Sequence, residues 1–253
     1  MRQLIKLSFI SGLIVNGYVF AADPVQGFYL GLQGEISHAP TNQFSFTANQ
    51  VLYSGQITMQ PVGAGAGASI GYKIQKFRLE GELLVNTNSY NQAQIGSCTL
   101  ISPNLLGPRG SCPDFIRNNG LGFKGSTTGA YGLFNVFYDF LSSNPDNNVV
   151  PYFGLGLGFA QLKNTVQIEN NQYVNAGSYI PIATKTTSTK TGVALQGVLG
   201  VNFYIDDFVT IGMDYRYLSA AKSSNSTTTT TSGNSQYAIN TLNFVANFAL
   251  EKV

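Results

Sequence analysis

The sequence has few charged residues, no tryptophan and a single histidine among its 253 residues. Charged residues make up 10% of the chain, whereas ordinary soluble domains carry about 25%. The formal net charge of +2 lacks the basic excess of nucleic-acid-binding domains, so we expect no nucleic-acid partner. Aromatic residues reach 12% and β-branched residues are plentiful, which excludes a disordered chain. The composition favours a folded, β-rich protein.

A long apolar run is also missing. After the first 21 residues, no stretch approaches the about 18 consecutive apolar residues that a membrane-spanning helix needs. At the N-terminus, two basic residues precede a short apolar core at 7–15 and the small-x-small sequence Val19–Ala21. This pattern predicts a cleaved export signal over 1–21 and a mature domain over 22–253. An N-terminal membrane anchor is the alternative.

Period-two alternation is the main signal in the rest of the chain. In YFGLGLGFAQL, residues 152–162, Phe153, Leu155, Leu157 and Phe159 alternate with small residues. A phosphate-binding glycine loop would be followed at once by a helix pattern, and none follows here. Alternation of this kind is typical of a strand whose two faces meet different surroundings.

Eight segments of the chain alternate in this way. They lie at about 26–37, 62–74, 77–88, 122–140, 152–162, 191–205, 208–218 and 237–250. Short connections alternate without exception with four long ones, at about 38–61, 89–121, 163–190 and 219–236. Outer-membrane barrels place every long loop at one end and have an apolar outer face. The sequence therefore predicts an all-β fold, an eight-stranded antiparallel up-and-down transmembrane β-barrel.

Most strand charges fall on the face opposite the apolar residues, which is the lumen of such a barrel. They are Glu35, Arg78, Glu80, Glu82, Asp139, Asp214 and Arg216. Buried charges must be paired, so we expect the acids to meet Arg78, Arg216 and also Lys73. An eight-stranded lumen is just wide enough for side chains, which favours a structural ion-pair network. A polar ion path gated by these pairs is the alternative.

The two cysteines, Cys98 and Cys112, both lie in the second long connection. Export to an oxidising compartment predicts a disulfide between them. A zinc site is the alternative, but no second pair of ligands is near, so we predict no metal site and no cofactor. His38 is the only histidine, and it has no serine-hydrolase motif beside it. We therefore predict no catalytic residues and no enzymatic activity.

Four stretches carry a family resemblance: FRLEGELLVN, GLFNVFYDF, PYFGLGLGFA and VNFYIDDFVTIGMDYRY. They resemble the rickettsial-type surface antigen family and, more broadly, opacity and outer-membrane-protein-A type eight-stranded barrels. The matching positions are Arg78–Glu82, Phe137–Phe140 and Pro151–Gly158. The resemblance implies a location in the Gram-negative outer membrane, four surface loops and a role in antigenicity, adhesion or envelope integrity.

The sequence thus predicts a surface-exposed outer-membrane barrel. Its expected partners are outer-membrane lipid and, through the external loops, host or envelope proteins. A small porin or ion channel is the alternative function. A lipid-modifying enzyme and a soluble carrier of the lipocalin type are weaker alternatives. No prediction of the oligomeric state follows from the sequence.

Overall fold

The computed structural model describes residues 26–48, 50–102, 108–117, 122–141, 148–175, 178–221 and 236–250. The predicted export signal at 1–21 lies outside these residues, as does most of the last long connection. In the described part of the chain, no helix is long and apolar enough to cross a bilayer.

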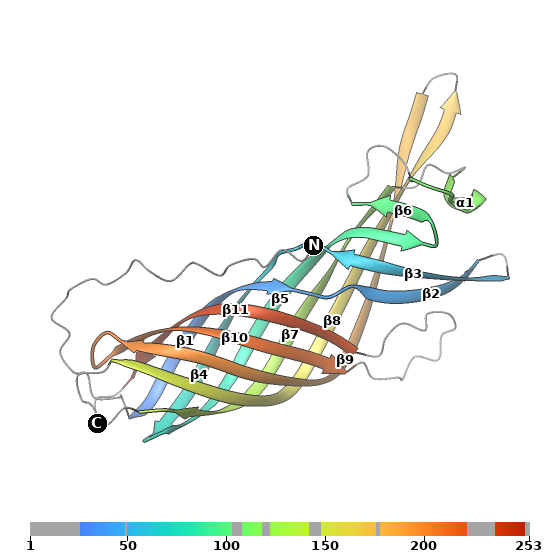
Figure 1. Ribbon diagram of the computed structural model, residues 1–253. Helices are drawn as coiled ribbons and strands as arrows, with labels where there is room; N and C mark the ends of the chain where they lie inside the picture. The colour runs from blue at the N-terminus through green and yellow to red at the C-terminus, as the bar shows by residue number, and fades with distance from the viewer. Residues whose placement is uncertain are drawn as a thin grey trace, which may run out of the picture.

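Eight antiparallel strands close into a ring (Figure 1). In ring order they are β1 (Gly27–His38), β4 (Gly63–Ile74), β5 (Phe77–Ile95), β7 (Gly122–Asp139), β8 (Val149–Asn175), β9 (Ser178–Tyr204), β10 (Val209–Ala221) and β11 (Gln236–Ala249). The ring closes where β1 pairs with β11, with Leu32 opposite Ala246. This is the predicted barrel, and each of its strands contains one of the eight alternating segments.

The strands are staggered around the ring. A path of paired residues that leaves β1 at Phe28 and crosses every strand once returns to β1 at His38, ten residues further along. With ordinary strand spacing, a stagger of this size tilts the strands by about 40° and gives a barrel radius of about 8 Å. Such a barrel has room for side chains but little free bore.

The outer face of the ring is apolar and exposed. On β8 the outward side chains Leu155, Leu157 and Phe159 are 66%, 57% and 73% exposed. At the end with the short connections, aromatic rings lie in contact across neighbouring strands, as in the pairs Phe28–Tyr72 and Phe77–Tyr138. An apolar band bordered by aromatic residues is typical of a barrel in a membrane.

Glycines on the inner face make space for the side chains of neighbouring strands. A Cβ atom on Gly71 would overlap the ring of Tyr29, and one on Gly156 would overlap the amide of Asn135. The glycines of the 152–162 segment therefore serve packing in a narrow lumen, because the neighbouring side chains lie directly over their backbone.

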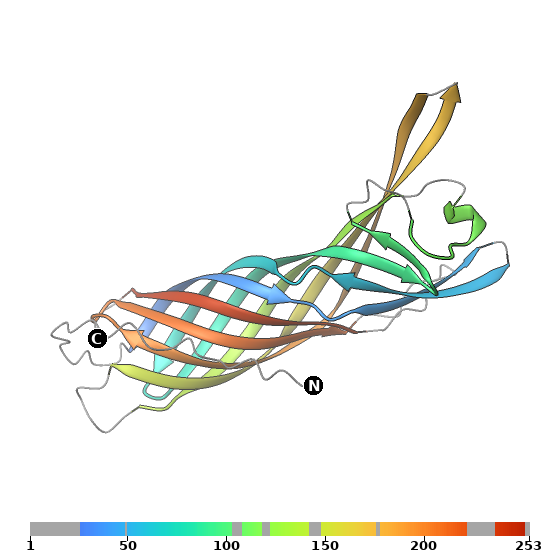
Figure 2. The same cartoon turned by 45° about the horizontal axis from the view of Figure 1, so that its top comes forward.

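Further elements lie beyond the end with the long connections, called here the loop end (Figures 1 and 2). They are β2 (Asn42–Ala48), β3 (Val51–Met59), β6 (Cys98–Ile101) and the short helix α1 (Asp114–Arg117). β2 pairs with β3, and β3 and β6 both pair with the far part of β5. The opposite end is called the turn end.

These elements correct the prediction of long loops. The predicted loop at 163–190 is mostly strand, because β8 and β9 remain paired as far as Asn175 and Ser178. The predicted loops at 38–61 and 89–121 contain β2, β3, β6 and the end of β5. Alternating hydrophobicity arises only where one face meets lipid and the other the lumen. A ribbon with water on both faces, such as the threonine-rich stretch 185–189, has no such pattern, although β-branched residues favour a strand.

Candidate functional site

A mid-barrel cluster of buried charges centres on Arg216. Its Nη1 donates to Glu82 Oε1 at 2.6 Å, and its Nε donates to Asp214 Oδ1 at 2.7 Å. Amide groups complete the shell, because Gln33 and Asn135 donate to the two oxygens of Glu82 at 2.5 Å each. Every ion in this cluster is thus both paired and hydrogen-bonded, as a charge removed from water requires.

A turn-end cluster is built around Asp139, which meets two cations. Arg78 Nε donates to Asp139 Oδ1 at 3.0 Å, and Lys73 Nζ lies 2.8 Å from Oδ2 as a charge contact without hydrogen-bond alignment. The guanidinium of Arg78 also lies over the rings of Phe137 and Tyr152, 4.6 and 4.5 Å from their centres. Cation–π contacts of this kind add stability where the cation is desolvated.

Glu35 and Glu80 differ from the expectation that every lumen acid meets a cation. Glu35 accepts a hydrogen bond from Asn86 Nδ2 at 2.5 Å, and Glu80 accepts one from the Tyr29 hydroxyl at 2.9 Å. Neither forms an ion pair with any of the described residues. Hydrogen bonds from these neutral donors take the place of an ion pair at both acids, and Glu35 Oε2 has no hydrogen-bond partner among the described residues.

An apolar layer fills part of the lumen on the loop-end side of the mid-barrel cluster, beside the buried polar side chains of Ser37, Asn86 and Asn88. On several strands, the first or second inward side chain on the loop-end side of the mid-barrel cluster is apolar. The layer consists of Leu84, Tyr131, Leu133, Ala160, Leu162, Ala194, Leu218, Tyr237 and Ile239, all buried. The sequence reasoning missed this layer, in which Leu84 is a single apolar side chain between the inward Glu82 and Asn86 of β5.

The apolar layer continues into the elements beyond the ring at the loop end. These elements are β2, β3, β6, α1 and the far parts of β5, β8 and β9, called here the platform. The cluster that holds the layer also contains Met59, Tyr90, Phe123, Leu100 and Ile116 from β3, β5, β7, β6 and α1. The rings of Tyr90 and Phe123 stack with their centres 5.8 Å apart. The loop end is therefore a packed continuation of the barrel, and it has its own hydrophobic core.

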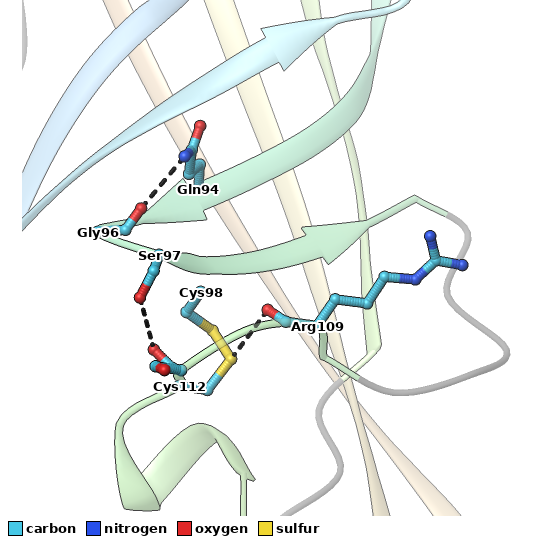
Figure 3. The surroundings of a disulfide bond; sticks show 7 residues. Gln94, Gly96, Ser97, Cys98, Arg109 and Cys112 are labelled. Carbon is cyan, nitrogen blue, oxygen red and sulfur yellow. Dashed lines mark hydrogen bonds between the residues drawn. A yellow bond between two sulfur atoms is a disulfide. The ribbon is translucent and has the colours of Figure 1, made fainter.

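A disulfide joins β6 to the segment before α1 (Figure 3). It links Cys98 to Cys112, 14 residues apart, and Cys98 is buried in the loop-end core. The backbones of Thr99 and Arg109 exchange two hydrogen bonds beside it, at 2.8 and 2.9 Å. Closing a loop of this size stabilises by about 3 kcal/mol in the chain-entropy model. Both thiols are used in the disulfide, so neither is available as a metal ligand.

A family model, described as the outer membrane protein beta-barrel domain, matches residues 7–249. The chain belongs to this family. No curated protein sequence matches the chain.

Three solved structures are similar to this outer membrane barrel at low identity. OprG from Pseudomonas aeruginosa is 10% identical, with 90% of this chain and 99% of that chain covered and a TM-score of 0.50. Neisserial surface protein A is 17% identical, with coverages of 89% and 99% and a TM-score of 0.40. Ail of Yersinia pestis is 11% identical, with coverages of 88% and 99% and a TM-score of 0.41.

The only histidine of this outer membrane barrel lies away from the buried charges. His38 is the last residue of β1, is exposed, and has its Nδ1 3.2 Å from the carbonyl oxygen of Pro61. Among the described residues, no group of three or more histidine, cysteine or acidic side chains is arranged to hold a metal ion.

Proposed function

We propose that this outer membrane barrel is a surface-exposed binding protein whose loop end contacts a partner outside the cell. The role would be in adhesion, as a surface antigen, or in the integrity of the envelope. The observation that carries the proposal is the construction of the loop end. There β3 and β6 pair with the far part of β5, β2 pairs with β3, and Ile116 of α1 packs in the same hydrophobic core. The far parts of β8 and β9 project as a paired ribbon, and the Cys98–Cys112 disulfide ties β6 to the segment before α1.

Ordering so many residues outside the bilayer costs conformational entropy. A surface that is ordered before binding loses less of that entropy when its partner arrives, so preorganisation favours affinity. The β8–β9 ribbon shows how far the paired strands extend beyond the ring. Pairing of β9 with β10 ends at Ala194, whereas its pairing with β8 continues to Ser178. At ordinary strand rise, these residues span about 50 Å.

The alternative function, a small porin, has less support. The mid-barrel cluster joins side chains from five strands across the lumen, since Asn243 of β11 also donates to Asp214. The loop-end side of the cluster is filled by the apolar layer and by hydrogen-bonded polar side chains such as Asn86 and Asn88. An ion would have to displace paired charges and then pass these packed side chains. Both steps cost free energy that a diffusion channel avoids by having an open, wet bore.

The proposal includes an orientation and an export route. Barrels of this kind insert with short turns in the periplasm and long connections outside. We infer the same orientation here, with residues 1–21 removed during export and residues 22–253 forming the barrel domain.

Trypsin treatment of intact cells tests this orientation. Exposed basic residues lie on the platform at Arg109 and Arg117, whereas Lys76 is exposed in the turn between β4 and β5. We expect cleavage at the platform residues in intact cells and cleavage at Lys76 only after the envelope is broken. Cleavage at Lys76 in intact cells, with the platform residues protected, would show the opposite orientation and overturn the proposal.

A binding assay then tests the role of the platform. Cells carrying the wild-type chain are compared with cells in which residues 44–55, the outer part of the β2–β3 hairpin, are replaced by a short Gly-Asn turn. A Cys98→Ser/Cys112→Ser variant is a second loop-end change, and Lys76→Gln is the matched turn-end control. We expect both loop-end variants to lose attachment to host cells or envelope components while still folding as barrels. Attachment that is equal in all four strains would overturn the binding role.

A further inference from the structure

Charged side chains outside the lumen are distributed unequally between the two ends of the barrel. Among the residues whose side chains the structure describes, the loop end carries the exposed Arg109, Arg117, Lys124, Lys163 and Lys185 and one acidic side chain, Asp114. Asp114 is already paired with Arg117 at 2.5 Å. The turn end carries two acidic residues, Asp206 and Asp207, and one exposed basic residue, Lys76. The platform therefore presents a positive surface.

Three of these lysines share the outer wall of β7, β8 and β9, called here the lysine wall. Lys124 and Lys185 stand in one register row, on either side of Gln167. Two strand spacings separate them, so their Cα atoms are about 9.5 Å apart. Lys163 lies four residues nearer the membrane on β8, on the same face as the exposed Phe159. Within the part of the chain that the structure describes, none of the three lysines forms an ion pair.

An apolar groove lies directly below the lysine wall on the same strands. It has a volume of about 690 Å³ and is lined mainly by Ala130, Phe159, Gln161, Thr191 and Val193. Ala130, Gln161 and Thr191 form one register row, two residues below Lys163. Phe159 also lines a second groove, of about 580 Å³, that extends over β4, β5 and β7. Apolar hollows on the lipid-facing wall thus begin where the polar residues end.

We propose that this wall binds a phosphate-bearing, anionic lipid of the outer leaflet. Its acyl chains lie in the groove beside Phe159, and its headgroup phosphates contact Lys163 and the Lys124–Lys185 row. The inference goes beyond the proposed function and rests on the orientation inferred there, with the loop end outside.

A lipid is the occupant that fits both halves of the site. The groove lies in the apolar band that faces the bilayer, where acyl chains are the available ligand. The lysines begin just above that band, at the level where headgroups lie. Lysine binds phosphate as a point charge, and each lysine near an anionic lipid surface adds to the attraction. A soluble anion would use the lysines alone and would leave the groove without a role.

Binding of fluorescent diphosphorylated lipid A to the purified, folded full-length mature barrel in zwitterionic detergent micelles tests the proposal. We expect the Lys124→Gln/Lys163→Gln/Lys185→Gln variant to bind about a hundredfold more weakly than wild type, from the ordinary contribution of three lysines at an anionic surface. The charge-matched control is Lys76→Gln/Arg109→Gln/Arg117→Gln, which removes three exposed cations away from the wall and is expected to bind like wild type.

Two further measurements identify the source of the bound phosphate and the position of the acyl chains. Inorganic phosphate is expected not to displace the lipid, and dephosphorylated lipid A is expected to bind weakly and equally to wild type and the lysine variant. Ala130→Phe, which fills the groove, is expected to weaken binding without removing its salt dependence.

Several results would overturn the assignment. One is a loss of lipid binding in the charge-matched control as large as that in the lysine variant. Another is equal lipid binding by wild type and the lysine variant. A third is displacement of the lipid by inorganic phosphate at the same concentration as the lipid. Unchanged binding by Ala130→Phe would overturn the placement of the chains in the groove. Because the assay uses purified protein, its outcome is independent of the attachment assay on cells. A reversed orientation would appear in the trypsin map and leave lipid binding in micelles intact.

Discussion

Arg216 on β10 and Glu82 on β5 form an ion pair across the barrel interior, with Nη1 2.6 Å from Oε1. The two strands are not neighbours in the ring, because β10 pairs with β9 and β11, whereas β5 pairs with β4 and β7. The pair therefore links opposite walls of the barrel through side chains alone. Both side chains are almost fully buried, at 3% and 0% exposed.

Removing the cation of this pair is expected to destabilise the barrel strongly. Arg216→Ala leaves the carboxylates of Glu82 and Asp214 buried without a cation, and breaking a buried pair from one side costs about 3–5 kcal/mol. Equilibrium unfolding by urea in lipid vesicles measures the change in the free energy of unfolding. The control is Arg117→Ala, which breaks an ion pair whose side chains are 66% and 77% exposed and is expected to cost less than about 1 kcal/mol. Equal losses in the two variants would contradict the structural role of the mid-barrel cluster.

Glycines on the inner and outer faces are expected to respond differently to an added methyl group. A Cβ atom at Gly158 on β8 would overlap backbone atoms of Gly132 and Leu133, which cannot move aside as the end of a side chain can. Gly158→Ala is therefore expected to lower the free energy of unfolding by about 1–3 kcal/mol, as overpacking does.

The matched control for this variant is Gly197→Ala on the neighbouring strand. A Cβ atom at Gly197 meets nothing within 4 Å. Removing a glycine without strain stabilises by about 0.4–1 kcal/mol, so a neutral or slightly positive change is expected. Both variants are measured by the same unfolding experiment in vesicles. A larger loss at Gly197 than at Gly158 would show that the inner-face packing is described wrongly.

The barrel itself could be predicted because the bilayer imposes a pattern on the sequence. Residues such as Phe153 and Leu155 face lipid while Gly154 faces the lumen, and this difference repeats along each strand. The alternation of short and long connections then determines which end carries the platform. The strand ends outside the bilayer could not be predicted in the same way, because water on both faces removes the alternation.

The sequence predicts which charged residues face the lumen, but it does not predict which of them pair with one another. The sequence shows that Asp139 and Glu35 face inward, but which cation each meets depends on the stagger of the whole ring. That stagger brings Lys73 and Arg78 to Asp139 and leaves Glu35 with Asn86. The apolar layer could have been predicted from the sequence, because Leu84 and Ile239 occupy inward positions on strands that the sequence predicts correctly.

The disulfide is expected to stabilise the platform and to have little effect on the barrel. Cys98→Ser/Cys112→Ser removes a constraint of about 3 kcal/mol from a loop that has no part in the closed ring. Hydrogen exchange is expected to become faster in β6 and around Arg109, while exchange in β10 and β11 stays unchanged. Reduction of the wild-type protein is the matched control, and it should reproduce the effect. Loss of protection throughout the barrel would contradict the independence of the two parts.

The filled lumen is expected to block steady ion flow. In planar bilayers the wild-type barrel should show no lasting conductance steps, because the mid-barrel cluster and the apolar layer both fill the bore. In the Arg216→Ala background, which breaks the mid-barrel cluster, Leu84→Gly/Ile239→Gly also removes two large side chains of the layer and is expected to produce conductance steps. Leu83→Gly/Leu199→Gly is the control, because both leucines face lipid at 71% and 65% exposed, and it should remain silent. A steady conductance in the wild type that disappears in Glu82→Gln would contradict this expectation, since the charged pairs would then line a working ion path and the porin function would replace the binding role.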